Sequence, residues 1–323
     1  MISINDVKRR LPENALCAFE QQFSPAVFNK LLLAFRAERV SSFRVNTLKA
    51  ERQDVLRRLR SDSINVQEVG YIPNAFTTDG KNNKQLLNHP LTKNGEIYLQ
   101  SISSMVPPLL LDPQPGSMVL DIAAAPGSKT SQLAALMKNT GHIDAVEPEF
   151  IRIERLRHNL TLLGAEIVET HHTTGQKFTA ERLDHYDFVL ADVPCSGEGR
   201  FSVYDRASYG NWRESEILRF SNLQKKLLSA AIRSAKKNAV IVYSTCTLNC
   251  RENEEVVHTV LQEFKGNVTV VPVPQNYKKI TDVIPTFKSH AGTVYAVEIS
   301  GALRVLPSQF TEGFFMCILK KNE

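Results

Sequence analysis

The sequence predicts an α/β fold: a doubly wound domain with a mainly parallel sheet over residues 113–323, preceded by a small basic α+β domain over residues 1–112. Two observations support this fold class. From Ser117 onward, short apolar runs alternate with longer segments of helical periodicity, the pattern of strand–helix–strand units. The apolar runs show no alternation of polar and apolar residues, which is typical of strands buried on both faces.

The first 112 residues contain shorter and more varied elements. Apolar residues about four apart predict helical structure within residues 6–39, and a run of aromatic and β-branched residues predicts a strand over 41–46. The other expected elements are a helix over 51–60, strands over 64–69 and 96–99, a loop over 79–94, and a helix over 101–111 that leads to the second domain.

The second domain is predicted as a regular alternation that ends in two strands. The expected strands are 118–122, 142–146, 167–170, 187–191 and 239–243, and the expected helices are 128–138, 150–163 and 223–237. Residues 293–299 and 314–319 are expected to form a hairpin at the edge of the sheet.

Basic residues are concentrated at the start of the chain. Residues 1–60 contain 12 Lys and Arg against 6 Asp and Glu, a charge of +6, whereas the whole chain carries +5, so the remaining residues sum to −1. Such a segment favours a polyanionic partner such as nucleic acid, and the alternative is an ordinary solvated surface.

Cysteine content and hydropathy bear on the compartment. The five cysteines are odd in number and irregularly spaced, which favours free thiols in a reducing compartment over a disulfide framework. No apolar run approaches the length of a membrane span, and the first residues lack the apolar core of a signal peptide. We therefore expect a cytoplasmic protein with no membrane partner, and a monomer.

The segment from Asp121 to Thr130, Asp-Ile-Ala-Ala-Ala-Pro-Gly-Ser-Lys-Thr, joins the first predicted strand to the first helix of the second domain. Its small residues allow a ligand to approach the backbone, but the glycine spacing is neither that of a phosphate loop nor that of a dinucleotide fold. Glu147 ends the next strand, where an acidic residue typically holds ribose hydroxyls. The combination favours S-adenosyl-L-methionine as cofactor, although Asp121 could also form a turn and Glu147 cap a helix.

Two cysteines directly follow apolar runs: Cys195 in Pro-Cys-Ser-Gly and Cys246 in Ser-Thr-Cys-Thr. If both runs are neighbouring parallel strands, about 4.8 Å apart, both thiols emerge at the carboxyl edge of the sheet, where such sheets bind ligands. Two thiols could then flank one small substrate. The alternative is that each is a small buried apolar residue. A zinc site formed with Cys250 is not expected, because there is no Cys-x-x-Cys pair.

With these motifs the chain resembles the RNA cytosine-C5 methyltransferases of the NOL1/NOP2/Sun (RsmB/NOP) family. The matching segments are Asp121 to Lys129, Asp192 to Gly197, Tyr243 to Thr247 with Glu252 to Glu254, Arg44 to Asn46, and Glu312 to Phe315. The resemblance implies a Rossmann-like class I methyltransferase domain, an RRM-like N-terminal domain, and tRNA or rRNA as the partner.

The resemblance also implies roles for three residues. Cys246 is the attacking thiol, Cys195 assists release of the product, and Asp192 contacts the base and lies near the cofactor. The chemistry needs such groups, because C5 of cytosine is a poor nucleophile until a thiolate adds at C6. A carboxyl near N3 would stabilise the resulting shift of charge.

The expected cofactor-binding residues come from the loop after the first strand, the next strand end and two later positions. They are Ala123, Ala124, Ala125, Pro126, Gly127, Ser128, Lys129, Glu147, Arg152, Thr174 and Asp192. Three of these depart from the family pattern: Ala123 replaces a cysteine, Ser128 a glycine, and Thr174 an aspartate that contacts the adenine amino group. The last change removes a charge-assisted hydrogen bond.

Residues after the Pro-Cys loop are candidates for RNA contacts. They are Phe201, Tyr204, Tyr209 and Trp212 for stacking on bases, and Arg200, Arg206 and Arg213 for phosphates. Two alternatives to the RNA enzyme stay open. One is a DNA cytosine-C5 methyltransferase, and the other is an RNA-binding assembly factor that keeps the fold with weak or lost catalysis.

Overall fold

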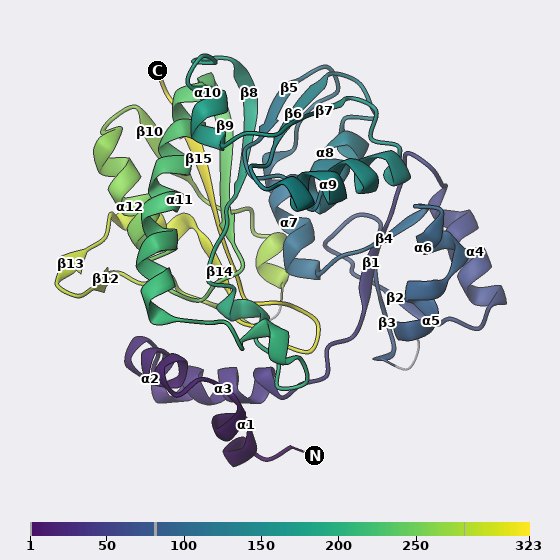
Figure 1. Cartoon of the computed structure of the whole chain (residues 1–323), viewed down its shortest axis with the longest axis horizontal. Helices are drawn as coiled ribbons and strands as arrows, with labels where there is room; N and C mark the ends of the chain where they lie inside the picture. The colour runs from purple at the N-terminus through teal and green to yellow at the C-terminus, as the bar shows by residue number, and fades with distance from the viewer. Residues whose placement is uncertain (1, 81–82, 281) are drawn as a thin grey trace.

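A nine-stranded sheet forms the centre of the computed structural model, which describes residues 2–80, 83–280 and 282–323. Figure 1 shows three parts: the large sheet and its helices, a small sheet with helices at the right, and three N-terminal helices at the bottom. Among the described residues, no helix combines the length and apolar character needed to cross a bilayer.

Five parallel strands make up one side of the large sheet, with β7 at its edge. They are β5 (Met118–Asp121), β6 (His142–Val146), β7 (Val168–His171), β8 (Tyr186–Asp192) and β9 (Ala235–Thr245), and their spatial order is β9-β8-β5-β6-β7. Beyond β9, the neighbouring strand is β15 (Phe314–Lys321), which runs antiparallel to β9. Strand β15 also pairs with β14 (Leu303–Val305) and with β10 (Val268–Val271). Strand β11 (Val283–Ile284) pairs with β14. The predicted mainly parallel, Rossmann-like sheet is confirmed.

Helices cover both faces of this sheet. The helices α7 (Ile102–Leu111), α8 (Ser128–Leu136) and α9 (Phe150–Leu163) pack on one face, and α10 (Gly175–Thr179), α11 (Glu214–Ser234) and α12 (Glu254–Glu263) on the other. Successive residues of β5 therefore enter different cores: Val119 the first, and Leu120 the second. Burial on both faces explains why these strands are continuous apolar runs.

The small sheet is antiparallel and has its own core. Its spatial order is β2 (Val66–Glu68), β3 (Ala75–Thr78), β1 (Ser42–Val45) and β4 (Ile97–Leu99). One helix, α4 (Arg52–Ser61), follows β1, and two short ones, α5 (Asn83–Asn88) and α6 (Pro90–Lys93), precede β4. The chain order is thus strand, helix, two strands, helices, strand, the order of a split β-α-β fold.

The prediction of a loop over 79–94 is wrong for residues 83–93, and residues 81–82 lie outside the described residues. Leu86 and Leu91 are buried in the core of the small sheet, so tertiary packing holds both turns of helix. Pro90 begins α6, and the His89 ring accepts a hydrogen bond from the Leu91 amide. Strand β3 was not expected.

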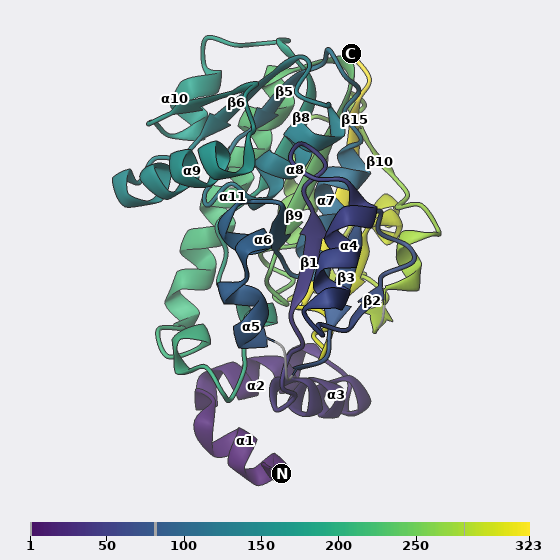
Figure 2. The same cartoon turned by 90° about the vertical axis from the view of Figure 1, so that its right-hand side faces the viewer.

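The N-terminal helices are α1 (Ile4–Arg10), α2 (Glu13–Gln22) and α3 (Pro25–Phe35), and they pack on the second domain. Figure 2 shows them below both sheets. Their core includes Phe201, which lies 6.0 Å from Phe19 between ring centroids. Gln22 donates to the carbonyl oxygen of Leu248 at 2.7 Å. These helices are thus tied to the segments that follow β8 and β9, and the assignment of residues 1–112 to an RNA-binding domain stays a prediction.

The last predicted hairpin is partly wrong. Residues 293–299 do not form a strand of the large sheet: β13 (Thr293–Val294) pairs with β12 (Ser289–His290), and η5 (Val297–Gly301) is a 3-10 helix. Ile299, inside this short helix, and Tyr295, two residues before it, are both buried in the core on the α12 side, so packing favours the short helix over an extended strand. The strand that pairs with β15 is β14, and β15 lies inside the sheet rather than at its edge. Strand β9 begins at Ala235, inside the predicted helix 223–237.

Candidate active site

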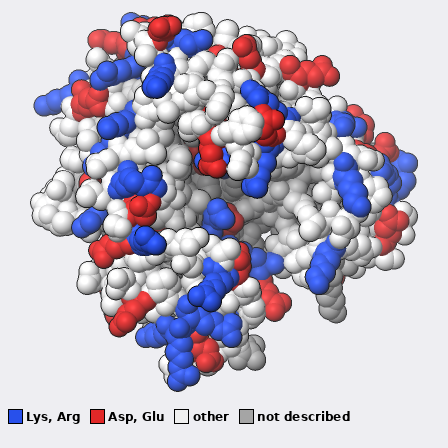
Figure 3. Space-filling view, in the orientation of Figure 1, with Lys and Arg blue, Asp and Glu red and all other residues white. Residues whose placement is uncertain are grey.

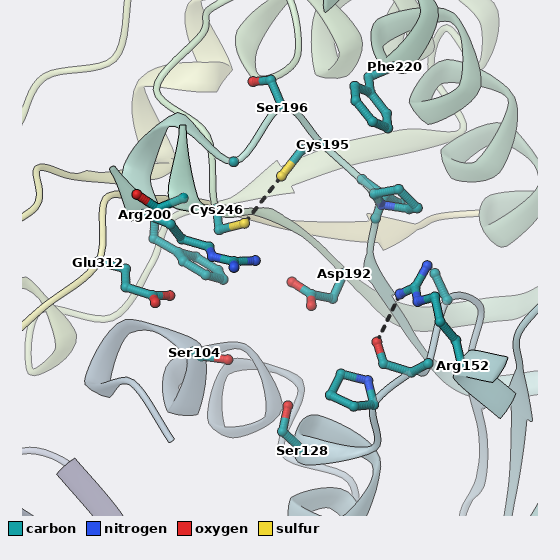
Figure 4. Close-up of a pocket in the computed structure, with 18 of the residues that line it drawn as sticks. Ser104, Ser128, Arg152, Asp192, Cys195, Ser196, Arg200, Phe220, Cys246 and Glu312 are labelled. Atoms are coloured by element: carbon teal, nitrogen blue, oxygen red, sulfur yellow. Dashed lines mark hydrogen bonds between the residues drawn. The ribbon is translucent and has the colours of Figure 1, made fainter. Parts of the chain in front are cut away.

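A cavity of about 720 Å³ opens at the carboxyl ends of β5, β8 and β9. Figure 3 shows the hollow near the middle of the molecule, and Figure 4 shows the side chains that line it. Its walls come from the loops after these strands, from α8 and from the segment before β15. In open α/β sheets this edge is the usual place for a ligand.

Both predicted cysteines reach this cavity from neighbouring strands. Cys195 follows β8 and Cys246 follows β9, and these strands pair in parallel with Asp192 opposite Ser244. The two Sγ atoms lie 3.3 Å apart. The hydrogen bond to Cys246 and burial raise the pKa of the Cys195 thiol well above its ordinary value. At neutral pH the Cys195 thiol therefore keeps its proton.

A close approach of backbone supports the Cys246 loop. The Gly199 amide donates to the Cys246 carbonyl at 3.0 Å, and the Gly313 amide donates to the Gly199 carbonyl at 2.8 Å. A Cβ added to Gly199 would lie 2.0 Å from the Gly313 carbonyl oxygen. Only glycine fits at position 199, because any side chain would collide with backbone.

Glu252 ties the two cysteine loops together from behind. Its carboxylate accepts hydrogen bonds from the Ser196 amide at 3.0 Å and from Gln224 at 2.9 Å. Thr247 donates to it at 3.4 Å, so residues next to each cysteine share one buried carboxylate. Burial raises the pKa of Glu252. Glu252 belongs to the motif Glu252 to Glu254, which predicts no role for it, and no sequence pattern marks Gln224.

A second buried carboxyl, Glu198, lies beside the first. It accepts hydrogen bonds from Trp212 at 3.2 Å, from Thr247 at 3.2 Å and from Asn249 at 3.4 Å. Burial raises the pKa of Glu198 to about 7, and nearby Glu252 adds to the rise. A role for Glu198 in the site is not predicted from sequence, because a glutamate in a glycine-rich loop is expected to be exposed to solvent.

Asp192 faces the cavity between the thiols and the loop after β5 (Figure 4). Lys129 Nζ lies 2.7 Å from one carboxylate oxygen, and the Ser244 hydroxyl donates to the other at 2.7 Å. Burial opposes the charge of Lys129, but Asp192 outweighs it, so the pKa of Lys129 is raised. Lys129 also donates to the Ser104 hydroxyl at 2.7 Å. These contacts hold the Asp192 carboxylate in one orientation.

The loop after β5 contains a buried carboxylate with a free acceptor. Thr130 donates to Asp121 Oδ2 at 2.7 Å, whereas Asp121 Oδ1 has no hydrogen-bond partner within the described part of the chain. Burial raises the pKa of Asp121 to about 7. A buried acceptor without a partner is costly, so a ligand that donates a hydrogen bond here would be stabilised.

Most of the predicted cofactor residues line the cavity. They are Ala123, Ala124, Ala125, Pro126, Ser128, Lys129, Arg152 and Asp192. Gly127 instead begins α8 with a φ of +100°, where a Cβ would meet Leu156 at 2.9 Å. Glu147 is buried behind Arg152, 3.3 Å away, and Arg152 also donates to the Ala125 carbonyl at 3.1 Å (Figure 4).

Thr174 is not among the described residues that line the cavity. It is the N-cap of α10, and its hydroxyl accepts a hydrogen bond from the Lys177 amide at 3.4 Å. Its structural role is therefore that of a helix cap, and its contact with a cofactor stays a prediction.

The candidate RNA-contact residues separate into three groups. Tyr209, Trp212, Arg200 and Arg213 line the cavity. Phe201 is fully buried among the phenylalanines of the N-terminal helices, so its prediction as a stacking residue is wrong. Tyr204 is exposed, but neither it nor Arg206 belongs to the described lining of the cavity.

Arg44 connects the small sheet to this site. It is buried and donates to Gln100 at 3.0 Å and to the Ser131 hydroxyl of α8 at 2.7 Å. Gln100 in turn donates to the carbonyl oxygen of Ser104, whose hydroxyl contacts Lys129. The Arg44 motif therefore couples the small sheet to the helix that follows the cofactor loop.

Comparison with known proteins identifies the family. The family model described as 16S rRNA methyltransferase RsmB/F matches residues 108–320. Ribosomal RNA small subunit methyltransferase F of Shewanella amazonensis is 36% identical over 284 residues, which cover 87% of this chain and 58% of that protein. The tRNA (cytosine(49)-C(5))-methyltransferase of Pyrococcus abyssi is 33% identical over 287 residues, which cover 87% of this chain and 88% of that protein.

A solved structure is similar to this chain over its whole length. The crystal structure of a methyltransferase homolog protein from Pyrococcus horikoshii superposes with a TM-score of 0.82 at 30% identity, and the match covers 99% of each chain. The chain spans only 57–58% of the length of the small-subunit rRNA relatives from Serratia and Shewanella. The resemblance inferred from the motifs is confirmed: the chain belongs to the RsmB/F family of methyltransferases.

Proposed function

We propose that the protein transfers a methyl group from S-adenosylmethionine to C5 of a cytosine in RNA. The observation that carries this proposal is the pair of thiols, 3.3 Å apart, in one cavity with Asp192 and the small-residue loop after β5. A cavity of about 720 Å³ is large enough for a nucleoside cofactor and a flipped base edge.

The first chemical step is assigned to Cys246. Its thiolate adds to C6 of the cytosine, the C5=C6 electron pair moves to form C4=C5, the C4=N3 pair moves onto N3, and N3 takes up a proton from solvent. C5 then has enamine character and can attack a methyl group. The assignment follows the family motif around Cys246, and the raised pKa of the Cys195 thiol agrees with it, because a thiol that keeps its proton is the poorer nucleophile.

Asp192 is assigned to the base edge. It lies between the thiols and the cofactor loop, and Lys129 and Ser244 fix its orientation. A carboxyl there stabilises the charge that moves onto N3 as the sulfur–C6 bond forms. After methyl transfer, a base removes the C5 proton, C5=C6 forms again and the sulfur of Cys246 leaves; Cys195 assists this release.

The residues around Asp121 fit S-adenosylmethionine. The cofactor supplies an electrophilic methyl group on a sulfonium sulfur. Asp121 offers a buried free acceptor, and the run of alanines lets a ligand lie against backbone. Arg152 lines the side of the site expected to hold the ribose, and Glu147 is buried 3.3 Å behind it.

RNA is the proposed partner, bound over the N-terminal region. In Figure 3, Lys and Arg gather over the N-terminal helices at the bottom and over the small-sheet domain at the right. The last turn of α1 contains Lys8, Arg9 and Arg10, and the last turn of α4 contains Arg58 and Arg60. These charges suit a phosphate backbone without selecting a sequence. A monomeric, cytoplasmic protein stays a prediction from sequence.

Methyl transfer to RNA tests the proposal directly. The purified protein with S-adenosylmethionine should methylate cytosine in tRNA or 16S rRNA transcripts, read by bisulfite sequencing, and should leave DNA of the same sequence unmodified. Cys246→Ala should abolish transfer, whereas Cys195→Ala should accumulate a covalent protein–RNA adduct visible on a denaturing gel. Transfer at an undiminished rate by Cys246→Ala would refute the mechanism. Calorimetry without detectable cofactor binding would favour the non-catalytic assembly factor.

A further inference from the structure

Arg200 places a cation beside the reactive thiol. Its side chain lines the cavity, and in Figure 4 its guanidinium lies next to the Cys246 sulfur, on the side facing Asp192. Arg200 belongs to the same loop as Cys195 and follows it by five positions in the chain. From sequence, Arg200 is predicted only as a candidate for a phosphate contact.

The backbone before and after Arg200 is held by hydrogen bonds and by packing. Arg39, from the segment between α3 and β1, donates to the carbonyl oxygens of Gly199 at 3.1 Å, Arg200 at 3.2 Å and Phe201 at 3.2 Å. Phe201 is buried among the N-terminal helices, and Gly199 bonds to the Cys246 backbone. The Arg200 side chain therefore starts from a fixed point beside Cys246.

The other charged or titratable groups around Cys246 are already engaged. Lys129, from α8, is 2.7 Å from Asp192, at the end of β8. Glu312, before β15, pairs with Arg39 at 3.8 Å, and Cys195 shares its hydrogen bond with Cys246 itself. Across residues 2–80, 83–280 and 282–323, Arg200 has no carboxylate within 4.0 Å. Lys129 also interacts with the charge of Cys246, and Glu312 with that of Arg200, but Cys246 has a larger effect on the pKa of Arg200 than Glu312 has.

We propose that Arg200 stabilises the thiolate of Cys246 and so activates the nucleophile, an inference that rests on the role of Cys246 proposed above. The thiol proton passes to solvent, and Arg200 stays protonated because guanidinium does not give up its proton in proteins. A cation beside a cysteine increases the fraction of thiolate, the form that attacks carbon.

The electrostatic coupling of the two groups agrees with this role. The charge of the Cys246 sulfur raises the pKa of Arg200 above its ordinary value, so each group stabilises the charged form of the other. Arg200 is exposed to the open cavity, so water weakens the attraction. The expected effect on thiol ionisation is therefore about one pH unit rather than several.

Alkylation of Cys246 measures this effect without RNA or cofactor. The rate of carboxamidomethylation by iodoacetamide, followed by mass spectrometry of the Cys246 peptide from pH 5.5 to 9.5, should rise with the thiolate fraction. In Arg200→Gln the midpoint should move up by about one unit, which lowers the rate at pH 7 about tenfold. Arg200→Lys keeps the charge and should recover part of the rate. Arg213→Gln, from the same cavity wall, should leave the alkylation midpoint unchanged.

Methylation kinetics provide the second readout. Arg200→Gln should lower kcat at pH 7 more than it raises the KM for RNA, and kcat should recover as the pH rises. An unchanged alkylation midpoint with a raised KM for RNA would overturn the inference and make Arg200 a phosphate contact. Full methylation by Cys246→Ala is the separate outcome that would overturn the proposed function.

Discussion

Two fully buried carboxyls, Glu198 at the cysteine end of the cavity and Asp121 at the cofactor end, show how the two ends differ. Burial raises the pKa of each to about 7. Both oxygens of Glu198 accept hydrogen bonds, from Trp212, Asn249 and Thr247. Asp121 Oδ1 has no partner among the described residues.

The difference separates preorganisation from ligand binding. At the cysteine end, hydrogen bonds within the protein hold both oxygens of Glu198 and of Glu252, so the geometry of these carboxyls is set before RNA arrives. The cofactor end keeps an unsatisfied acceptor that costs free energy until a ligand donates to it. Mutations at the cysteine end should therefore damage folding and catalysis, and those at the cofactor end should change affinity for the ligand.

The largest effect is expected from Gly199→Ala at the cysteine end. Its Cβ would meet the Gly313 carbonyl oxygen at 2.0 Å, so the backbone below Cys246 must shift. We expect a loss of about 3 kcal/mol in the free energy of unfolding and no measurable methyl transfer. Urea denaturation and a methylation assay measure the two effects.

Gly197→Ala is the matched control for that loop. Gly197 has a φ of +73° but no atom within 4 Å of an added Cβ, so only backbone strain opposes alanine there. A cost of about 1 kcal/mol is expected. Equal losses for both variants would show that the contact between the two glycine backbones does not support the site.

A smaller and opposite effect is expected from Asp121→Asn at the cofactor end. The native Asp121 carboxyl, with its pKa raised to about 7 from 3.8, binds a proton more tightly than in the unfolded chain. It therefore lowers stability as the pH rises from about 4 to 7. The asparagine variant should be more stable than the wild type at pH 8, and the difference should shrink toward pH 4.

In Asp121→Asn, the affinity for S-adenosylmethionine should fall although the stability at pH 8 rises. Loss of a charged acceptor should weaken S-adenosylmethionine binding about tenfold, as measured by calorimetry at pH 8. Unchanged affinity together with unchanged stability would mean that Asp121 is merely a turn former, the alternative weighed from sequence.

The smallest effect is expected from Thr174→Asp. Aspartate caps helices as well as threonine does, so α10 should persist. If residue 174 faces the adenine amino group, the added carboxylate should tighten cofactor binding a few-fold. Thr173→Asp serves as the neighbouring control. Identical affinities in both variants and the wild type would show that position 174 does not contact the cofactor.

Much of the catalytic domain could be predicted from sequence because its signals are local. The strands β5, β6, β8 and β9 are continuous apolar runs, and the motifs sit directly after them, so the edge at which Cys195 and Cys246 emerge followed from parallel pairing. The errors lie where local propensity and packing disagree, as in residues 293–299, where Tyr295 and Ile299 turn inward together.

Local sequence was enough to predict the α/β fold class, the position of the two thiols after neighbouring strands and the character of the cofactor loop, because each depends on residues adjacent in the chain. Long-range packing, by contrast, brings Arg39, Gly313 and Glu252 to the cysteine loops that they support. It also places the N-terminal helices against Phe201. The contacts of Glu252 with Ser196 and of Arg39 with Gly199 join residues 56 and 160 apart, a separation over which local propensity carries no information.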